Sequence, residues 1–105
     1  MILSDKHIAI IDNILKKNFS DCRILVFGSR VTNKSKQFSD LDLAVDHNGS
    51  PLPLLKLADA KQDFINSDLP YSVDLVDLNR VDEKFKSIIL ADSLEWPAQV
   101  TSMSS

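Results

Sequence analysis

Three aspartates lie in segments with strand-like patterns, and together they could hold a metal ion. Asp40 and Asp42 belong to the alternating segment 40–46, while Asp74 interrupts the apolar run 71–78. Side chains two residues apart on a strand point to the same face, so Asp40 and Asp42 place two carboxylates a few ångströms apart. Like charges at this spacing repel each other unless a cation neutralises them. If the two strands are neighbours, Asp74 completes an oxygen-rich triad that suits Mg²⁺, and such a site can hold two ions for in-line phosphoryl displacement.

A simpler interpretation of two of these residues stays open. Asp40 can be an ordinary turn residue, because aspartate side chains bond to nearby backbone amides in turns. Asp42 can be solvated on an open face of the sheet. Asp74 is harder to explain in this way, since a carboxylate inside an apolar strand is unfavourable unless it is paired.

A glycine and a serine follow the run Cys22–Phe27, whose β-branched and aromatic residues predict a buried strand. Gly28 is one of only two glycines in the chain, which suggests that the backbone needs it there. Glycine lets a ligand approach the backbone closely, and amides at a helix start such as the one expected at Ser29 favour phosphate oxygens. A Gly-Ser pair after a strand is also typical of an ordinary turn, so by itself it is a weak sign of phosphate binding.

The elements that must position these residues alternate between helices and strands. This order predicts the fold class α+β (α/β), a small mixed β-sheet packed against helices. About a dozen residues separate the first two strands, too few for a comfortable parallel crossover, so that pair can be antiparallel or mixed. The predicted elements are a helix at 5–18, a strand at 22–27, a short helical turn and loop at 29–38, a strand at 40–46, a helix at 53–67, a strand at 71–78, a helix at 82–91 capped by Asn79, and a short edge strand at 93–96.

Length and charge narrow the class of protein. The 105 residues suffice for one domain, which we place at 1–97, followed by a flexible C-terminal tail at 98–105. The net charge of −3 argues against binding to DNA or to an anionic membrane, since both need clustered positive charge. Cys22 is the only cysteine, so no internal disulfide is possible, and we expect a reduced, cytoplasmic setting. The sequence shows no transmembrane or signal segment.

The combined pattern is more specific than its parts. It resembles the minimal nucleotidyltransferases of the DNA polymerase beta superfamily, whose signature is Gly-Ser, a spacer, Asp-x-Asp and a distal Asp. The resemblance extends over about residues 5–96. It is carried by Gly28-Ser29, ten intervening residues, Asp40-x-Asp42 and the distal Asp74, with Arg30 and Ser39 as fitting neighbours.

The resemblance implies a role for each of these residues. Nucleotide phosphates would be bound by Gly28, Ser29, Arg30 and Ser39. The catalytic residues and metal ligands would be Asp40, Asp42 and Asp74. The cofactor would be two Mg²⁺ ions, with Mn²⁺ as a possible substitute. Asp74 would also take the proton from the acceptor hydroxyl.

Some features depart from the family or leave an alternative open. Many relatives carry extra arginines or glycines between the two motifs, whereas segment 31–38 has only Lys34 and Lys36 as cations. Lysine binds phosphate as a point charge and lacks the arginine fork. Arg30 could stabilise phosphate charge or form an exposed structural ion pair. His47 could touch a metal or nucleotide, although an ordinary turn histidine is the more frequent case.

By this resemblance the chain would transfer AMP from ATP to a hydroxyl, with loss of pyrophosphate. Larger members add a helical domain for which no residues remain here. Minimal members work with a separately encoded helical protein of the HEPN or substrate-binding type, and in several pairs the nucleotidyltransferase is an antitoxin that modifies a tyrosine of the toxin. Two alternatives are the nucleotide-binding subunit of a two-protein small-molecule nucleotidyltransferase and a non-catalytic module that neutralises its partner by binding. A homodimer is also compatible with the sequence.

Overall fold

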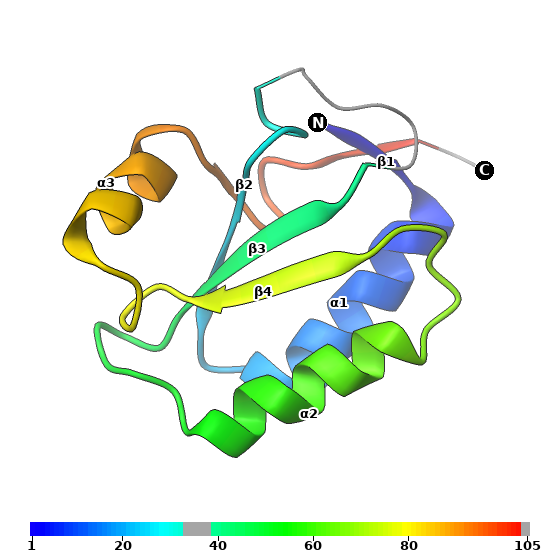
Figure 1. The fold of residues 1–105 in the computed structure, drawn as a ribbon. Helices are drawn as coiled ribbons and strands as arrows, with labels where there is room; N and C mark the ends of the chain where they lie inside the picture. Colours follow the sequence, from blue (N-terminus) through cyan, green and yellow to red (C-terminus); the bar gives the residue numbers. More distant parts are fainter. Residues whose placement is uncertain (33–38, 104–105) are drawn as a thin grey trace.

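A four-stranded mixed sheet carries helices on both of its faces (Figure 1). The structure, a computed structural model, describes residues 1–32 and 39–103. The elements in chain order are β1 (Ile2–Ser4), α1 (Asp5–Phe19), β2 (Arg23–Phe27), β3 (Leu41–Asp46), α2 (Leu54–Ile65), β4 (Val73–Asp77), α3 (Glu83–Ala91), β5 (Leu94–Glu95) and β6 (Thr101–Met103).

The main sheet has the strand order β4-β3-β2-β5. β2 pairs antiparallel with both β3 and β5, whereas β3 and β4 are parallel. The antiparallel pairing of β2 and β3 agrees with the short connection between them, and the parallel pair is joined through α2, as parallel strands require. The fold is thus the α+β arrangement with a small mixed sheet that the sequence predicts.

Two helices cover one face of this sheet. α1 begins where the Ser4 hydroxyl accepts a hydrogen bond from the His7 amide at 3.2 Å, and its predicted extent is confirmed. Together with α2 it packs on the apolar side chains of alternating strand residues, which form the larger core. No helix in the described part of the chain is long and apolar enough to cross a membrane. The strand residues of this core are Ile24, Val26, Leu41, Leu43, Val45 and Leu75.

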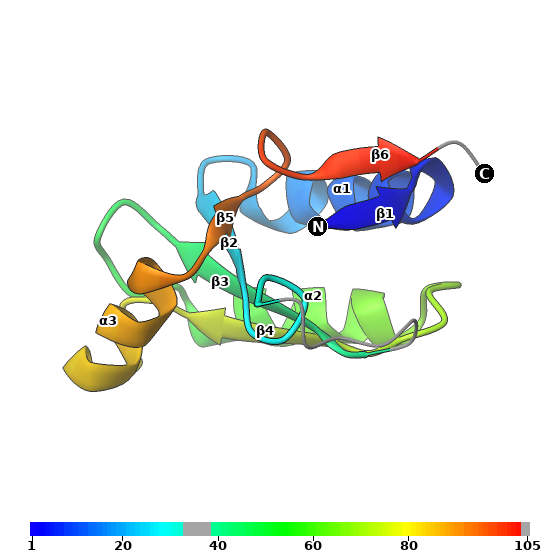
Figure 2. The same ribbon diagram turned by 90° about the horizontal axis from the view of Figure 1, so that it is seen from above.

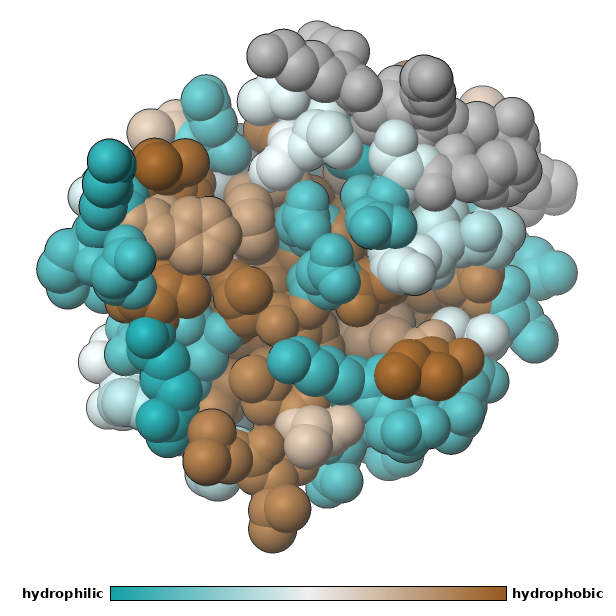
Figure 3. All heavy atoms as spheres, viewed as in Figure 1, coloured by the Kyte–Doolittle hydropathy of each residue, from teal (hydrophilic) through white to brown (hydrophobic). Residues whose placement is uncertain are grey.

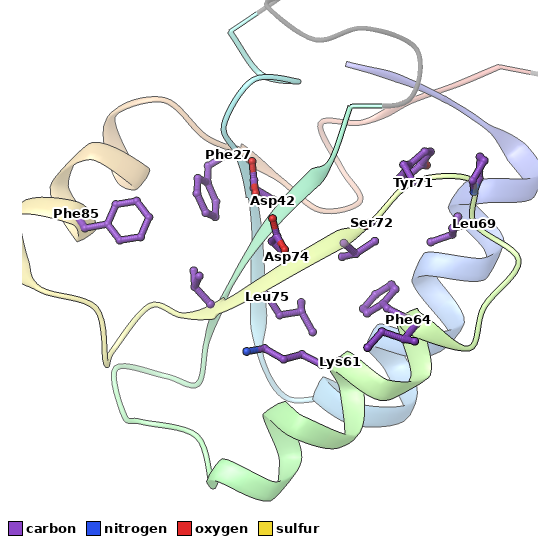
Figure 4. Close-up of a pocket in the computed structure, with 14 residues that line it drawn as sticks. Phe27, Asp42, Lys61, Phe64, Leu69, Tyr71, Ser72, Asp74, Leu75 and Phe85 are labelled. Atoms are coloured by element: carbon purple, nitrogen blue, oxygen red, sulfur yellow. The ribbon is translucent and has the colours of Figure 1, made fainter.

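The opposite face is only partly covered. α3 lies on the side of the sheet away from α1 (Figure 2). It packs over one end of this face in a small core made of Leu25, Ala44, Leu78 and Ile89. No helix of the described residues lies above the remainder of the face. Residues 1–32 and 39–103 therefore leave a stretch of β3 and β4 open on the side where Asp42 and Asp74 lie (Figure 4).

One detail of the elements differs from expectation. The residue that caps α3 is Asp82, whose carboxylate accepts from the Phe85 amide at 2.7 Å, and the prediction of Asn79 as the cap is wrong. The Asn79 amide group instead donates to Asp46 at 2.9 Å. The short helical turn expected after Gly28 is present at residues 29–32, where the Gly28 carbonyl accepts from the Val31 and Thr32 amides at 3.1 and 3.3 Å. Residues 33–38 lie outside the described residues.

The chain ends meet in a second, two-stranded sheet. β6 pairs in parallel with β1, with Leu3 opposite Ser102. Neither strand was expected, because each has only three residues and the pairing joins segments about a hundred residues apart in the chain. The flexible tail predicted from residue 98 thus includes residues with backbone pairing, and its mobility stays a prediction.

Candidate active site

Asp42 and Asp74 are direct neighbours on parallel strands. Asp42 of β3 is in register with Asp74 of β4, so the condition for the predicted triad, that these strands be adjacent, is met. Both side chains point to the open face of the sheet (Figure 4). The covered face takes the intervening residues Leu41, Leu43 and Leu75, as the period of two requires. The fold therefore brings together two carboxylates that are 32 positions apart in the chain.

Among the described residues, no positive charge pairs with either of these two carboxylates. Burial and the neighbouring carboxylates of Asp74 and Asp40 raise the pKa of Asp42 to about 6. Asp40 precedes β3 and is exposed. No ion pair within the described residues includes any of the three carboxylates. Three acids that repel one another on an open face are a donor set of the kind that a hard divalent cation fits.

Gly28 forms one wall of the site. It follows β2 with a φ of 83°, a left-handed conformation in which a side chain is strained. A Cβ built at this position would overlap the carboxylate of Asp42. Both observations explain why the chain uses a glycine here. The backbone of Gly28 and the Asp42 carboxylate can approach each other only because position 28 has no side chain.

Ser29 lies in the turn that follows, half-buried. Its neighbours Val31 and Thr32 donate their amides to the Gly28 carbonyl at 3.1 and 3.3 Å. Within the described part of the chain, neither the Ser29 amide nor its hydroxyl donates a hydrogen bond. Both groups are therefore available as donors next to Asp42, although they do not lie at a helix start.

Arg30 and Ser39 join the two ends of the loop between β2 and β3. The Arg30 guanidinium donates to the Ser39 carbonyl from Nε at 3.0 Å and from Nη2 at 2.6 Å. It also lies over the Tyr71 ring, 4.3 Å from the ring centre. Arg30 is only 8% exposed, so the alternative of an exposed ion pair is wrong. These contacts position the backbone just before Asp40, and phosphate binding by Arg30 and Ser39 stays a prediction.

A groove of about 890 Å³ passes the two aspartates. Sequence reasoning missed several of its walls. Lys61 and Phe64 come from α2, whereas Phe27 and Phe85 lie on the open face, with their rings edge to face and 5.9 Å between centres. Lys61 is the only cation among the described residues that line the groove (Figure 4). The position of Lys61 in the helical pattern of residues 54–65 does not indicate that it lines the groove. A sequence pattern does not distinguish a lysine that faces a site from one that faces solvent.

His47 lies at the other end of β3 from Asp42. Its ring Nε2 is 3.3 Å from Asp21, and Asp21, Cys22 and His47 form a small cluster that could hold a metal ion. Burial and the nearby Asp21 raise the pKa of the Cys22 thiol to about 11, which disfavours the thiolate that a metal would need. Contact between His47 and the Asp42 site is excluded by this placement. Lys34 and Lys36 lie outside the described residues.

The segment that carries Gly28, Ser29, Asp42 and Asp74 lies within a match to a known family of enzymes. Residues 9–94 match the family described as Polymerase beta, Nucleotidyltransferase. The chain belongs to the polymerase beta nucleotidyltransferase family. As a member of this family the protein is an enzyme, a nucleotidyltransferase.

Named relatives of this nucleotidyltransferase include proteins of toxin–antitoxin pairs. The chain is 40% identical over 87 residues to "Probable protein adenylyltransferase MntA" of Haemophilus influenzae. The matched region covers 83% of this chain and 75% of the relative. A toxin–antitoxin crystal structure with AMP-PNP matches with a TM-score of 0.68 and 25% identity, over 84% of this chain and 70% of that chain. A mutant of the toxin–antitoxin MntA-HpeT matches with a TM-score of 0.67 and 22% identity over the same shares, which supports the fold.

Proposed function

We propose that this nucleotidyltransferase transfers AMP from ATP to a tyrosine hydroxyl of a separately encoded helical, HEPN-type protein and acts as the antitoxin of the pair. The observation that carries the proposal is the in-register pair Asp42–Asp74 beside the side-chain-free wall at Gly28. The proposal is supported by the similarity to a relative named as a protein adenylyltransferase. A structural relative is described as a toxin–antitoxin with AMP-PNP, an ATP analogue. We place the reaction in the cytoplasm.

The residues of the chain would divide the work between binding and proton transfer. The Ser29 amide and hydroxyl donate to phosphate oxygens, and the absence of a side chain at Gly28 lets the Asp42 carboxylate lie against the backbone that leads to Ser29. The acceptor oxygen bonds to the α-phosphorus while the bond from that phosphorus to the β-phosphate oxygen breaks, and pyrophosphate leaves. Asp74, the more exposed of the two facing carboxylates, accepts the hydroxyl proton.

Asp40, Asp42 and Asp74 would hold two Mg²⁺ ions, with Mn²⁺ as a substitute. When bound, such ions neutralise the phosphate charge and lower the barrier to displacement. The raised pKa of Asp42 supports this assignment, because burial and the neighbouring carboxylates of Asp74 and Asp40 both disfavour its charged form in the absence of a cation. The position of Asp40 at the start of β3 lets it add a third oxygen donor from the same edge.

Intact-mass spectrometry of the helical protein encoded beside this one tests the proposal. Both proteins are incubated with Mg²⁺ and each NTP in turn, and peptide mapping locates the modified residue. With ATP we expect a gain of one or more AMP units on a tyrosine. Asp42→Asn should abolish the gain, whereas Asp59→Asn, an exposed carboxylate of α2, serves as the matched control and should not.

The outcomes separate the alternatives. A gain of mass with another NTP would correct the base but keep the reaction. Tight binding without any gain would move the function to neutralisation by contact or to a small-molecule acceptor. If Asp42→Asn left the modification unchanged, the catalytic role of that residue would be wrong.

A further inference from the structure

The proposed function does not involve the backbone groups along the outer edge of β4. Within the described chain β4 pairs only with β3, so it is an edge strand. The Leu41 amide donates to the Ser72 carbonyl at 2.9 Å, which shows that the backbone groups of Ser72 face β3. In a parallel ladder alternate residues face the partner strand, so Val73 and Leu75 direct their N–H and C=O groups to the open side.

This edge has few of the devices that usually prevent pairing. Proteins protect exposed strand edges with proline, bulges, very short strands or charged side chains, and of these β4 has only the carboxylates of Asp74 and Asp77. β4 contains no proline, and its register with β3 runs without interruption from Val73 to Asp77. No described residue bonds to the outward amides of Val73 and Leu75. The edge is therefore open to another strand.

The groove beside the two aspartates runs along this same edge. Its walls come from both sides of the sheet, with Lys61 and Phe64 of α2 on one side and Asp74 and Phe85 on the other. Lys61 extends from α2 toward β4 (Figure 4). Apolar surface continues on this side of the molecule between α3 and α2 (Figure 3). A hollow that passes around a strand edge has room for a chain lying beside that strand.

We propose that the open edge of β4 binds an extended segment of the protein that accepts the nucleotide, as an added strand. The inference rests on the proposed function and adds how the acceptor docks. Main-chain hydrogen bonds to Val73 and Leu75 would align the segment, as in other cases of strand addition. The acceptor residue opposite Asp74 then has its side chain on the same face as Asp74, at the spacing of cross-strand neighbours.

The geometry also specifies the chemistry of the segment. Its residues alternate between the two faces of the sheet. The residue that faces Asp74 carries the hydroxyl. Its two neighbours point toward α2, where they meet the ring of Phe64 and the ammonium group of Lys61, so they are apolar or acidic.

A pair of variants at one position tests the backbone contact. Val73→Pro removes the N–H that points away from the sheet and keeps all hydrogen bonds to β3. Proline is tolerated at such a position of an edge strand. Val73→Ala shortens the side chain and keeps the N–H. We expect the rate of acceptor labelling to be at least tenfold lower in Val73→Pro than in Val73→Ala, while the affinities of the two variants for AMP-PNP differ by less than twofold.

Amide exchange on the unaltered protein gives a second measurement that does not depend on how the variants fold. It is recorded for the protein with AMP-PNP, with and without the acceptor protein. We expect the amides of Val73 and Leu75 to exchange at least tenfold more slowly in the complex. The amides of Asp74 and Val76 face β3 and serve as the internal reference.

Each result has a distinct meaning. Equal labelling by the two variants, or no protection of Val73 and Leu75, overturns the docking proposal and leaves the nucleotidyl transfer intact. Protection that appears in the protein alone as its concentration rises would mean that a second copy occupies the edge, which also overturns it. Failure of the unaltered protein to label any acceptor would overturn the proposed function itself and with it the docking inference.

Discussion

Gly28 and Gly49 share a positive φ angle in different surroundings. Their φ angles are 83° and 80°. A Cβ at Gly28 would overlap the Asp42 carboxylate, whereas nothing lies within 4 Å of one at Gly49. The two positions therefore separate the strain of a left-handed residue from the need for space beside a functional carboxylate.

Alanine at each position makes this separation measurable. Both variants should lose roughly 1 kcal/mol of unfolding free energy through the left-handed conformation. Only Gly28→Ala should also displace Asp42, and a displacement of about 1 Å can lower the rate about 100-fold. The measurements are urea unfolding and the rate of AMP transfer. Equal rates in the two variants would contradict the role of Gly28 as the wall of the site.

The raised pKa of Asp42 has a consequence for stability. The folded protein holds a proton on this carboxyl with a pKa of about 6, against 3.8 for the unfolded chain. Between these values the folded state binds more protons than the unfolded state, so the contribution of Asp42 to stability falls as the pH rises through this window. Asp42→Asn should therefore be more stable than the metal-free parent at pH 7, by about 1–2 kcal/mol after allowance for solvent screening.

Thermal unfolding of the two proteins in EDTA from pH 4 to pH 7.5 checks this prediction. The difference between them should grow from pH 4 to pH 7 and change little beyond. Asp59→Asn, on the exposed side of α2, controls for the loss of one charge at a distance. A difference independent of pH would show that the Asp42 carboxyl is not strained by its neighbours.

At the scale of elements, the connection from β2 to β3 is held at both ends by one side chain. Arg30 donates twice to the Ser39 carbonyl and stacks on Tyr71, and Asp40 follows immediately. Lysine keeps the charge but cannot make the fork, so Arg30→Lys should loosen the start of β3. We expect a loss of about 1–3 kcal/mol of unfolding free energy and slower transfer.

Arg23→Lys is the matched control for this prediction. Arg23 pairs with Glu95 at 2.9 Å on the surface, where about half of each side chain is exposed, and such pairs contribute little. The measurements are the free energy of unfolding in urea and the rate of AMP transfer for Arg30→Lys and Arg23→Lys. If the two substitutions have equal effects, Arg30 does not hold the start of β3 in place.

The elements also show which features of the fold can be predicted from sequence. The alternation of Leu41, Leu43 and Val45 indicated a strand with one buried face, and its outward residues included Asp42. The pairing of Asp42 with Asp74 could only be stated as a condition, because register between strands depends on contacts distant in the chain. The burial of Arg30 was missed for the same reason, since its aromatic partner lies 41 positions later. A polar loop pattern contains no information about such a contact.

Over the whole molecule, the uneven covering of the sheet explains how one domain holds both a core and an open site. α1 and α2 bury one face completely enough to supply the main core. α3 covers only one end of the other face. The uncovered part carries the acidic residues, which destabilise the metal-free fold and leave space for nucleotide and acceptor. The stability of the whole fold should therefore respond to ligands at this face.

Binding of Mg²⁺ should raise the melting temperature of the whole domain. A ligand present at ten times its Kd stabilises the folded state by about 1.4 kcal/mol, which corresponds to roughly 5–10 °C for a domain of this size. The shift should shrink as the pH falls from 7 to 5, because protons compete for Asp42, whose pKa is raised to about 6. Asp42→Asn should lose most of the shift, and Asp59→Asn should keep it. A shift that is equal in all three proteins would place the ion elsewhere, and the carboxylates of β3 and β4 would then need another explanation.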